Sequence, residues 1–437
     1  MYLKKTYQVE YQQIGTMTSP FRSGSSSGVE RKLPKLDVAG STPVSRSNFF
    51  LALPMAFKNF CLICSLFILG SCGQRQLAPE SPLDSPRNHY DRGLVQLERG
   101  DLRSAQREFD RAGALDPKFA GAFVGRALVA MRKQDFWQAR QDIGRAIHKD
   151  NDFIDAYIAR GRIVTEEGLQ RNYPTAEWRK EALSSFAKAI KKQPDYPASY
   201  YFRGQTYLQA LQLEEARESL TKVLELNQGP LVAKAMREIE TIQMVERAAP
   251  GSPMGLKIGL VKRISRAELA VLLLEEMKLG DIVRQRRIGK SITKFHSPQE
   301  NLAGETPTKA SDIVQSWAQP WIEEIIAIGI AGLEVFPDQT FQPDQFLTRS
   351  NYALVNQGVL LLLTGDRSLA TKYVGESSRY PDVRADFYAY NAIALSIERG
   401  FMSTDKISGR FRPNDNVSGA EALLIIRELQ NAFRLDF

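Results

Sequence analysis

The sequence predicts a mainly all-α protein with two helical modules in tandem, preceded by a segment that belongs to neither. Small residues recur with a period of 34 residues through 87–247, which indicates stacked helical hairpins. A different pattern, in which an aromatic-Ala pair is followed by a Gly, a Phe-x-Pro loop and an apolar helix, occurs twice within 312–423. Residues 1–54 have no periodicity at all. A chain of 437 residues has room for two or three domains, in agreement with this division.

The first 54 residues are expected to contribute nothing to a folded core. The stretch Ser25–Ser47 is rich in Ser, Pro and Gly and buries no apolar face. Two explanations remain open: a disordered arm, or a wrongly assigned extension upstream of a translation start at Met55. We favour the second, because Met55 begins a complete export signal.

That export signal is the uncharged run Phe60–Gly70, which follows Lys58 and ends in small residues before Cys72. A charged start, a short apolar run and a small-residue cleavage zone are typical of a signal peptide. A membrane-spanning helix needs about 20 apolar residues, a length reached here only by including Pro54 and Lys58. A spanning anchor is therefore the second choice.

The tetrapeptide Leu69–Cys72 resembles the lipobox of bacterial lipoproteins, with Gly70 a mild departure from the usual Ala or Ser. The resemblance implies a signal peptide over 55–72, a diacylglycerol on the Cys72 thiol and an acyl anchor in a membrane. Gly73 after the cysteine implies the outer membrane, facing the periplasm, with the cytoplasmic membrane as second choice. A Pro-rich tether over 73–86 would follow.

The cysteines exclude a disulfide framework in the folded body, because all three lie within twelve residues and none follows Cys72. Cys61 and Cys64 form a C-x-x-C, but a redox motif needs a strand-to-helix context and an electropositive neighbourhood that lowers a thiol pKa, whereas Leu, Ile and Phe surround this one. Two small hydrophobic residues are the better interpretation.

The charge distribution argues against a nucleic-acid partner. The formal net charge is +8, but residues 1–71 hold eight Lys/Arg against three acids, a net +5, which leaves +3 for the rest. The basic character is mostly a property of the N-terminal segment.

Residues 87–247 contain four units with equivalent positions and a final capping helix. The four units match at three kinds of site: small residues at Gly93, Ala127, Gly161 and Gly204; alanines at 105, 139, 182 and 216; and apolar residues at Phe109, Ile143, Phe186 and Leu220. The third unit is lengthened by an insertion within Glu166–Trp178. This pattern resembles the tetratricopeptide repeat (TPR), which implies an α-solenoid of antiparallel helix pairs.

The resemblance also implies a groove lined by the first helix of each unit, which would bind a protein or peptide. Family geometry directs five residues toward this groove: Arg87, Tyr90, Arg162, Tyr201 and Gln205. The alternative for each residue is a packing or solvated position. None of the five identifies the protein partner.

The C-terminal pattern, predicted over 255–433, ends each time in a short motif before an apolar helix. The motif reads "SRAE" at 265–268, "TRSN" at 348–351 and "SGAE" at 418–421. These endings resemble the T-R-A-E of S-layer homology (SLH) repeats, which occur as modules of three. The first repeat has only its second half, because no aromatic helix precedes it in the sequence. Ser or Thr followed by Glu also predicts a helix capping box.

The SLH resemblance implies binding to anionic cell-wall glycan or peptidoglycan in grooves between repeats. By position, the candidates are Arg266 and Arg349 as cations and Trp317 and Tyr388 as flat faces for a sugar ring. Core packing is the alternative for both aromatic residues. Gly419 lacks the guanidinium, so one groove should be weak or lost.

Catalytic chemistry is not apparent. The three histidines, His89, His148 and His296, form no metal-spaced or triad-like group, and no cofactor motif occurs. We expect a non-catalytic, lipid-anchored scaffold of the cell envelope without cofactors. The alternatives are an assembly factor of a secretion or polysaccharide-export complex, and a glycan-processing enzyme with unrecognised carboxylates.

Overall fold

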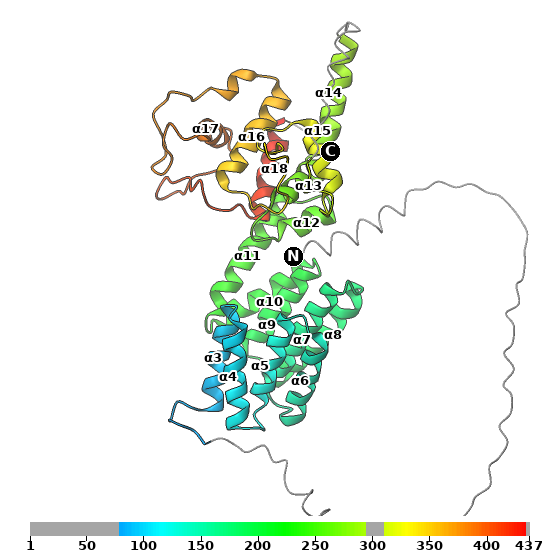
Figure 1. The fold of residues 1–437 in the computed structure, drawn as a ribbon, viewed down its shortest axis with the longest axis vertical. Helices are drawn as coiled ribbons and strands as arrows, with labels where there is room; N and C mark the ends of the chain where they lie inside the picture. Colours follow the sequence, from blue (N-terminus) through cyan, green and yellow to red (C-terminus); the bar gives the residue numbers. More distant parts are fainter. Residues whose placement is uncertain (1–77, 294–309, 434–437) are drawn as a thin grey trace, which may run out of the picture.

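The computed structural model describes residues 78–293 and 310–433, which form two helical bodies, one above the other in Figure 1. The proposed extension, the signal peptide with Cys72 and most of the tether lie outside these residues. The described residues are helical, with isolated β-bridges in place of strands, as predicted.

The lower body is the repeat array, an ordered series of antiparallel helix pairs (Figure 1). Its helices are α3 (Pro86–Glu98), α4 (Leu102–Leu115), α5 (Ala120–Arg132), α6 (Phe136–Lys149), α7 (Ile154–Gln170), α8 (Thr175–Lys192), α9 (Pro197–Gln209), α10 (Leu213–Leu226) and α11 (Leu231–Ala248).

The small residues of the repeat make room for aromatic rings. A Cβ added at Gly93 or Gly125 would lie 2.4 or 2.1 Å from the ring of Phe109, which is fully buried between the two helices. Gly161 has the same relation to Phe186, at 2.5 Å. The period seen in the sequence is therefore the period of contacts between a small residue and a larger apolar side chain, which is an aromatic ring in the first and third units and Leu220 against Gly204 in the fourth.

The insertion in the third unit lengthens its helix pair. Helices α7 and α8 have 17 and 18 residues, whereas α5 and α6 have 13 and 14. Trp178 is buried at the start of α8 and packs where Gly168 of α7 has no side chain. The extra length is thus packed helix and not an open loop.

The upper body is the C-terminal module (Figure 1). Its helices are α12 (Pro253–Gly259), α13 (Arg266–Glu275), α14 (Leu279–Thr293), α15 (Gln319–Ile328), α16 (Arg349–Thr364), the 3₁₀ turn η2 (Arg367–Ala370), α17 (Tyr390–Glu398) and α18 (Gly419–Phe433).

Three backbone hydrogen bonds close the C-terminal module into a ring. The N–H of Ile264 donates to Val417, that of Leu347 donates to Ile264, and that of Val417 donates to Leu347, over 2.9, 2.9 and 3.1 Å. Each of these residues precedes one of the three short endings. The three repeats are therefore related by an approximate threefold axis, with their ending helices α13, α16 and α18 around it.

Helix α11 takes the place of the leading helix that the first repeat lacks in the sequence. Each leading helix packs on the ending helix of the preceding repeat: α15 on α13 and α17 on α16. Helix α11 packs on α18 in the same way, which completes the ring. It also ends like α15, in a left-handed residue, Ala249 (φ 47°), where α15 has Gly329 (φ 78°).

The same helix also ends the repeat array. Ala235 and Ile242 of α11 belong to the core of the last array unit, whereas Val245 and Ala248 belong to the core of the C-terminal module. The two bodies are consequently joined by one continuous helix that is buried at both ends.

Candidate binding surfaces

Arg266, a predicted glycan contact, is buried in the joint between the first and second repeats. It is 3% exposed, and its Nε, Nη1 and Nη2 donate to the carbonyl oxygens of Phe341, Gly332 and Glu334 at 2.8, 2.9 and 2.8 Å. The guanidinium also lies 4.7 Å from the ring centroid of Phe341. Burial lowers the pKa of this guanidinium to about 10, so it stays charged at neutral pH. Through these hydrogen bonds Arg266 holds the loop of the second repeat in place.

Arg349 makes the equivalent joint between the second and third repeats. Its Nε donates to the Phe411 carbonyl at 2.8 Å, its Nη2 to the Ser403 carbonyl at 2.6 Å, and its Nη1 pairs with Glu421. The side chain is 14% exposed, which leaves it more accessible than Arg266.

The third joint has no arginine because there is no space for a side chain. A Cβ on Gly419 would lie 1.8 Å from the carbonyl oxygen of Ile258. Ile258 lies six residues before Ile264, just as Phe341 lies six residues before Leu347, so Ile258 and Phe341 are equivalent positions. Arg266 donates to the Phe341 oxygen, whereas the equivalent Ile258 oxygen lies directly against Gly419. Helix α12 thus closes the joint by backbone contact.

Two aspartates that the sequence reasoning missed hold the loops that the arginines clamp. Asp312 accepts the backbone N–H groups of Phe341 and Gln342, both at 2.8 Å. Asp382 accepts those of Phe411 and Arg412 at 2.9 and 2.7 Å. The available signal was the position of each Asp, 29 residues before its Phe.

The predicted aromatic candidates differ in exposure. Trp317 is 6% exposed and packs beside Trp321, with ring centroids 6.1 Å apart, so its face is in the core. Tyr388 is 68% exposed and rests against Phe387, at a centroid distance of 4.5 Å. Of the two, Tyr388 alone presents a ring to solvent.

The endings also cap their helices as the motif predicts. Ser265 accepts the N–H of Glu268 and the Glu268 carboxylate accepts the N–H of Ser265, which is a complete capping box. Thr348 and Ser418 accept from the residues three positions on.

In the array, two of the predicted groove residues lie next to each other, the buried Tyr90 and the exposed Arg87. Tyr90 is 1% exposed, and its hydroxyl donates to Asp155 at 3.0 Å while Tyr196 donates to the other oxygen of the same carboxylate at 2.9 Å. Arg87 lies 5.5 Å from the centroid of the Tyr90 ring and pairs with Asp91. Tyr90 therefore fastens α3 to α7, and Arg87 covers it from solvent.

The other three groove residues lie together on α7 and α9. The Arg162 guanidinium stacks 4.1 Å from the ring centroid of Phe202, and the Tyr201 ring lies 5.2 Å from that of Phe202. Burial lowers the pKa of Arg162 to about 10. The buried Nε2 of Gln205 has no hydrogen-bond partner within the described part of the chain. Of these three residues, Gln205 carries the unpaired donor, and Arg162 is a partly buried cation.

An ion pair links the first and last helices of the array. Lys234 at the start of α11 donates to Glu98 at the end of α3, at 3.1 Å and 136 residues apart.

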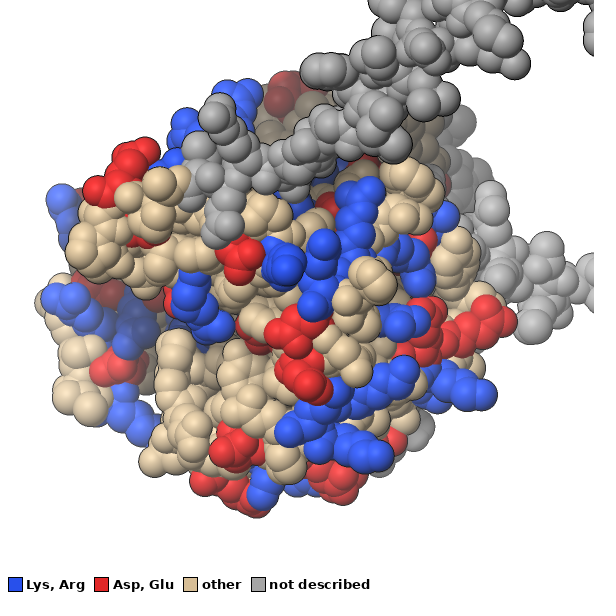
Figure 2. Space-filling model, turned by 90° about the horizontal axis from the view of Figure 1, so that it is seen from below, with Lys and Arg blue, Asp and Glu red and all other residues tan. Residues whose placement is uncertain are grey.

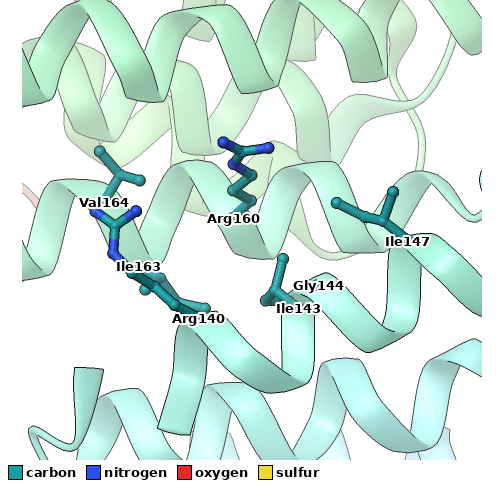
Figure 3. A pocket seen from close by; sticks show the side chains of 7 residues that line it. All are labelled: Arg140, Ile143, Gly144, Ile147, Arg160, Ile163 and Val164. Atoms are coloured by element: carbon teal, nitrogen blue, oxygen red, sulfur yellow. The ribbon is translucent and has the colours of Figure 1, made fainter. Parts of the chain in front are cut away.

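A hollow of about 240 Å³ lies between α6 and α7 (Figure 3). Its lining residues are Arg140, Ile143, Gly144, Ile147, Arg160, Ile163 and Val164. The sequence offered no motif for it, since the positions are ordinary helix residues.

Charges of both signs are interspersed over the face seen from the end of the array (Figure 2). In the portions of the chain that the structure covers, no group of three or more His, Cys, Asp or Glu is placed to hold a metal ion. None of the helices in these portions combines the length and apolar character needed to cross a membrane.

Comparison with protein families matches both modules. Tetratricopeptide repeat models match residues 90–152 and 179–239, and the S-layer homology domain model matches residues 379–423. The chain carries TPR repeats followed by an SLH domain. Such domains are typically non-catalytic, and an SLH domain indicates association with the cell envelope or surface.

The solved structures that the chain matches include a thermophilic TPR protein of Thermus thermophilus, 16% identical, with a TM-score of 0.33 over 48% of this chain and 100% of that one. YrrB, a TPR protein with an unusual peptide-binding site, is 19% identical, with a TM-score of 0.18 over 36% of this chain and 93% of that one. The sequence matches no curated protein.

Proposed function

We propose that this protein is a non-catalytic scaffold of the cell envelope. The SLH module binds wall glycan or peptidoglycan, the TPR array binds a protein partner, and an acyl chain on Cys72 anchors the protein in a membrane, the outer membrane being the first choice. The single observation that carries the scaffold role is helix α11, whose two halves lie in the cores of both modules. A partner and a glycan strand would be held in a fixed relative orientation.

The proposed glycan site combines Tyr388 with the joints held by Arg266 and Arg349. Tyr388 offers an exposed ring face for stacking on a sugar. The arginines act mainly through the loops that they fix, and Arg349 also has a partly exposed guanidinium. Trp317 supports the second repeat from within.

Co-sedimentation with purified sacculi tests the wall role. We expect the full-length Cys72→Ala protein to sediment with sacculi, and Tyr388→Ala to reduce the bound fraction severalfold at an unchanged melting temperature. Ile407→Ala is the matched control, because Ile407 is a 99% exposed apolar residue of the same module. Failure of the full-length Cys72→Ala protein to sediment would contradict wall binding. Release of soluble wall fragments would favour the glycan-processing enzyme instead.

Metabolic labelling with palmitate tests the anchor. Label should be incorporated into the natural protein and lost in Cys72→Ala. Labelling that survives the substitution would refute acylation at Cys72.

The proposed groove partner meets Arg162, Tyr201 and Gln205, since Gln205 carries an unpaired donor and the side chains of Arg162 and Tyr201 are partly exposed. Crosslinking from a photoreactive residue at position 201 in living cells would identify the partner. Components of a secretion or polysaccharide-export complex among the products would favour the assembly-factor alternative.

A further inference from the structure

We propose that the hollow between α6 and α7 is a second docking site of the TPR array, separate from the groove. It takes a peptide segment of a protein partner in which an aliphatic side chain is followed closely by a carboxylate. The proposal does not depend on the groove, and the test below keeps the two apart.

The floor of the hollow is apolar. Ile143 and Ile147 of α6 and Ile163 and Val164 of α7 line it, and Figure 3 shows Ile143, Gly144 and Ile147 along one stripe of α6. A volume of about 240 Å³ is below the roughly 300–1,000 Å³ of pockets for drug-sized ligands. One aliphatic side chain of a peptide is the occupant that suits this size.

Gly144 keeps the hollow open. A Cβ added at Gly144 would meet nothing within 4 Å, whereas one at Gly93, Gly125 or Gly161 would collide with a buried ring. A glycine inside a helix is roughly 1 kcal/mol less favourable than alanine. Neither packing nor backbone conformation requires a glycine at this position, so the structure of the array does not explain this loss of stability.

The rim of the hollow is suited to a carboxylate. Arg140 and Arg160 have side chains 43% and 42% exposed, and Glu181 of α8 already lies between them, with its Oε1 at 3.1 Å from Arg140 Nη1 and 3.6 Å from Arg160 Nη2. That spacing shows that one carboxylate can be shared by both guanidinium groups.

Donors remain for a second carboxylate. Arg160 donates no hydrogen bond to any residue that the structure describes, and its one ion pair, with Glu181, is long at 3.6 Å. The ion-pair network that includes the two rim arginines holds three cations (Arg140, Arg160 and Arg171) and two acids (Glu167 and Glu181). This surplus of one positive charge favours an anionic segment over a neutral or basic one.

Methyl NMR on the full-length protein tests the proposal, with signals from Ile143, Ile147 and Ile163 as reporters. The probe is a blocked peptide containing Leu followed by Glu, compared with its Gln counterpart and with a version that ends in Leu and a free carboxylate. We expect the Glu peptide to shift these three signals with a millimolar Kd, and the Gln peptide to bind at least fivefold more weakly. Tighter binding of the free-carboxylate version would identify a chain terminus as the source.

Gly144→Leu fills the hollow and should weaken binding at least tenfold without lowering the melting temperature. The matched control is Ala187→Leu, the same position one unit later, which is exposed on α8 and outside the hollow. Glu181→Gln removes the competing carboxylate and should tighten binding about threefold, a gain that a purely structural role does not predict.

Three results would overturn the proposal. The first is an absence of shifts at the three isoleucines, and the second is equal binding by wild-type and Gly144→Leu protein. The third is shifts with decanoate, an aliphatic carboxylate that is not a peptide, but none with the Glu peptide. Arg162→Gln reports on the groove and should leave this binding unchanged, so failure of one site is distinguishable from failure of the other.

Discussion

The array and the C-terminal module are both built from helical repeats, but they end differently. Array units pack on their neighbours in series, by rings set against glycines such as Phe109 against Gly125. The module closes into a ring, because its first helix, α11, packs against its last helix, α18. An open series tolerates local damage, whereas a ring has joints on which all three repeats depend.

The largest expected effect is at the joint without an arginine. Gly419→Ala should destabilise the module by about 4 kcal/mol or more, because a Cβ there collides with the Ile258 carbonyl, which is backbone and cannot rotate away. Chemical denaturation of the module, followed by tryptophan fluorescence, measures this loss. Gly251→Ala, whose Cβ has no atom closer than 3.8 Å, is the control and should be almost neutral. Equal stability of the two variants would refute the tight third joint.

The two arginine joints should differ in strength. Arg266→Ala should cost about 3 kcal/mol, since it leaves three carbonyl groups without a donor in a buried joint. Arg349→Ala should cost about 1–2 kcal/mol, because its side chain is closer to solvent. Lysine at position 266 should not restore stability, because one ammonium cannot reach all three oxygens. An Arg349 variant less stable than the Arg266 variant would contradict this ranking.

The array should show its own response to acid at its first unit. Asp84 is held by the Arg111 guanidinium, by the N–H of Glu80 and by His89, which together lower the pKa of its carboxyl below the usual 3.8. A lowered pKa means that the stabilisation is complete above the ordinary value and is lost as the pH falls below it.

Hydrogen exchange between pH 5 and pH 3 would follow this loss. We expect α3 to open in acid in the natural protein, and Asp84→Asn to open it already at neutral pH with little further pH dependence. An acid response unchanged by the substitution would place its origin elsewhere.

The smallest predicted effect is a gain. Ala249 has φ 47°, whereas the matching residues Gly329 and Gly400 have φ 78° and 75°. Ala249→Gly relieves the left-handed strain and should stabilise the module by up to about 1 kcal/mol. Thermal unfolding of the variant measures this gain, and a loss of stability would show that Ala249 is not strained.

The sequence predicted the array well because its determinants are local. Gly161 and Phe186 lie within one unit, and their positions recur in the other units, so their contact is visible as a period in the sequence. The family comparisons confirm TPR repeats followed by an SLH domain.

The sequence could not show which helix completes the first SLH repeat. Ile242 and Val245 are three residues apart in one amphipathic pattern, yet they belong to different cores. The carbonyl partners of Arg266 are 66 to 75 residues away, so its clamp is equally invisible in a motif. Periodicity identifies a buried face but not the body that buries it.

Helix α11 also has a mechanical consequence. Its 18 residues span about 27 Å, and both ends are embedded in packed cores with no flexible linker between them. A force applied between the two modules acts along the hydrogen-bonded axis of this helix, so it is transmitted directly from the array to the C-terminal module. Tension beyond what the α11–α18 contact withstands would open the ring before it stretched the helix, and the first SLH repeat would be the part that yields.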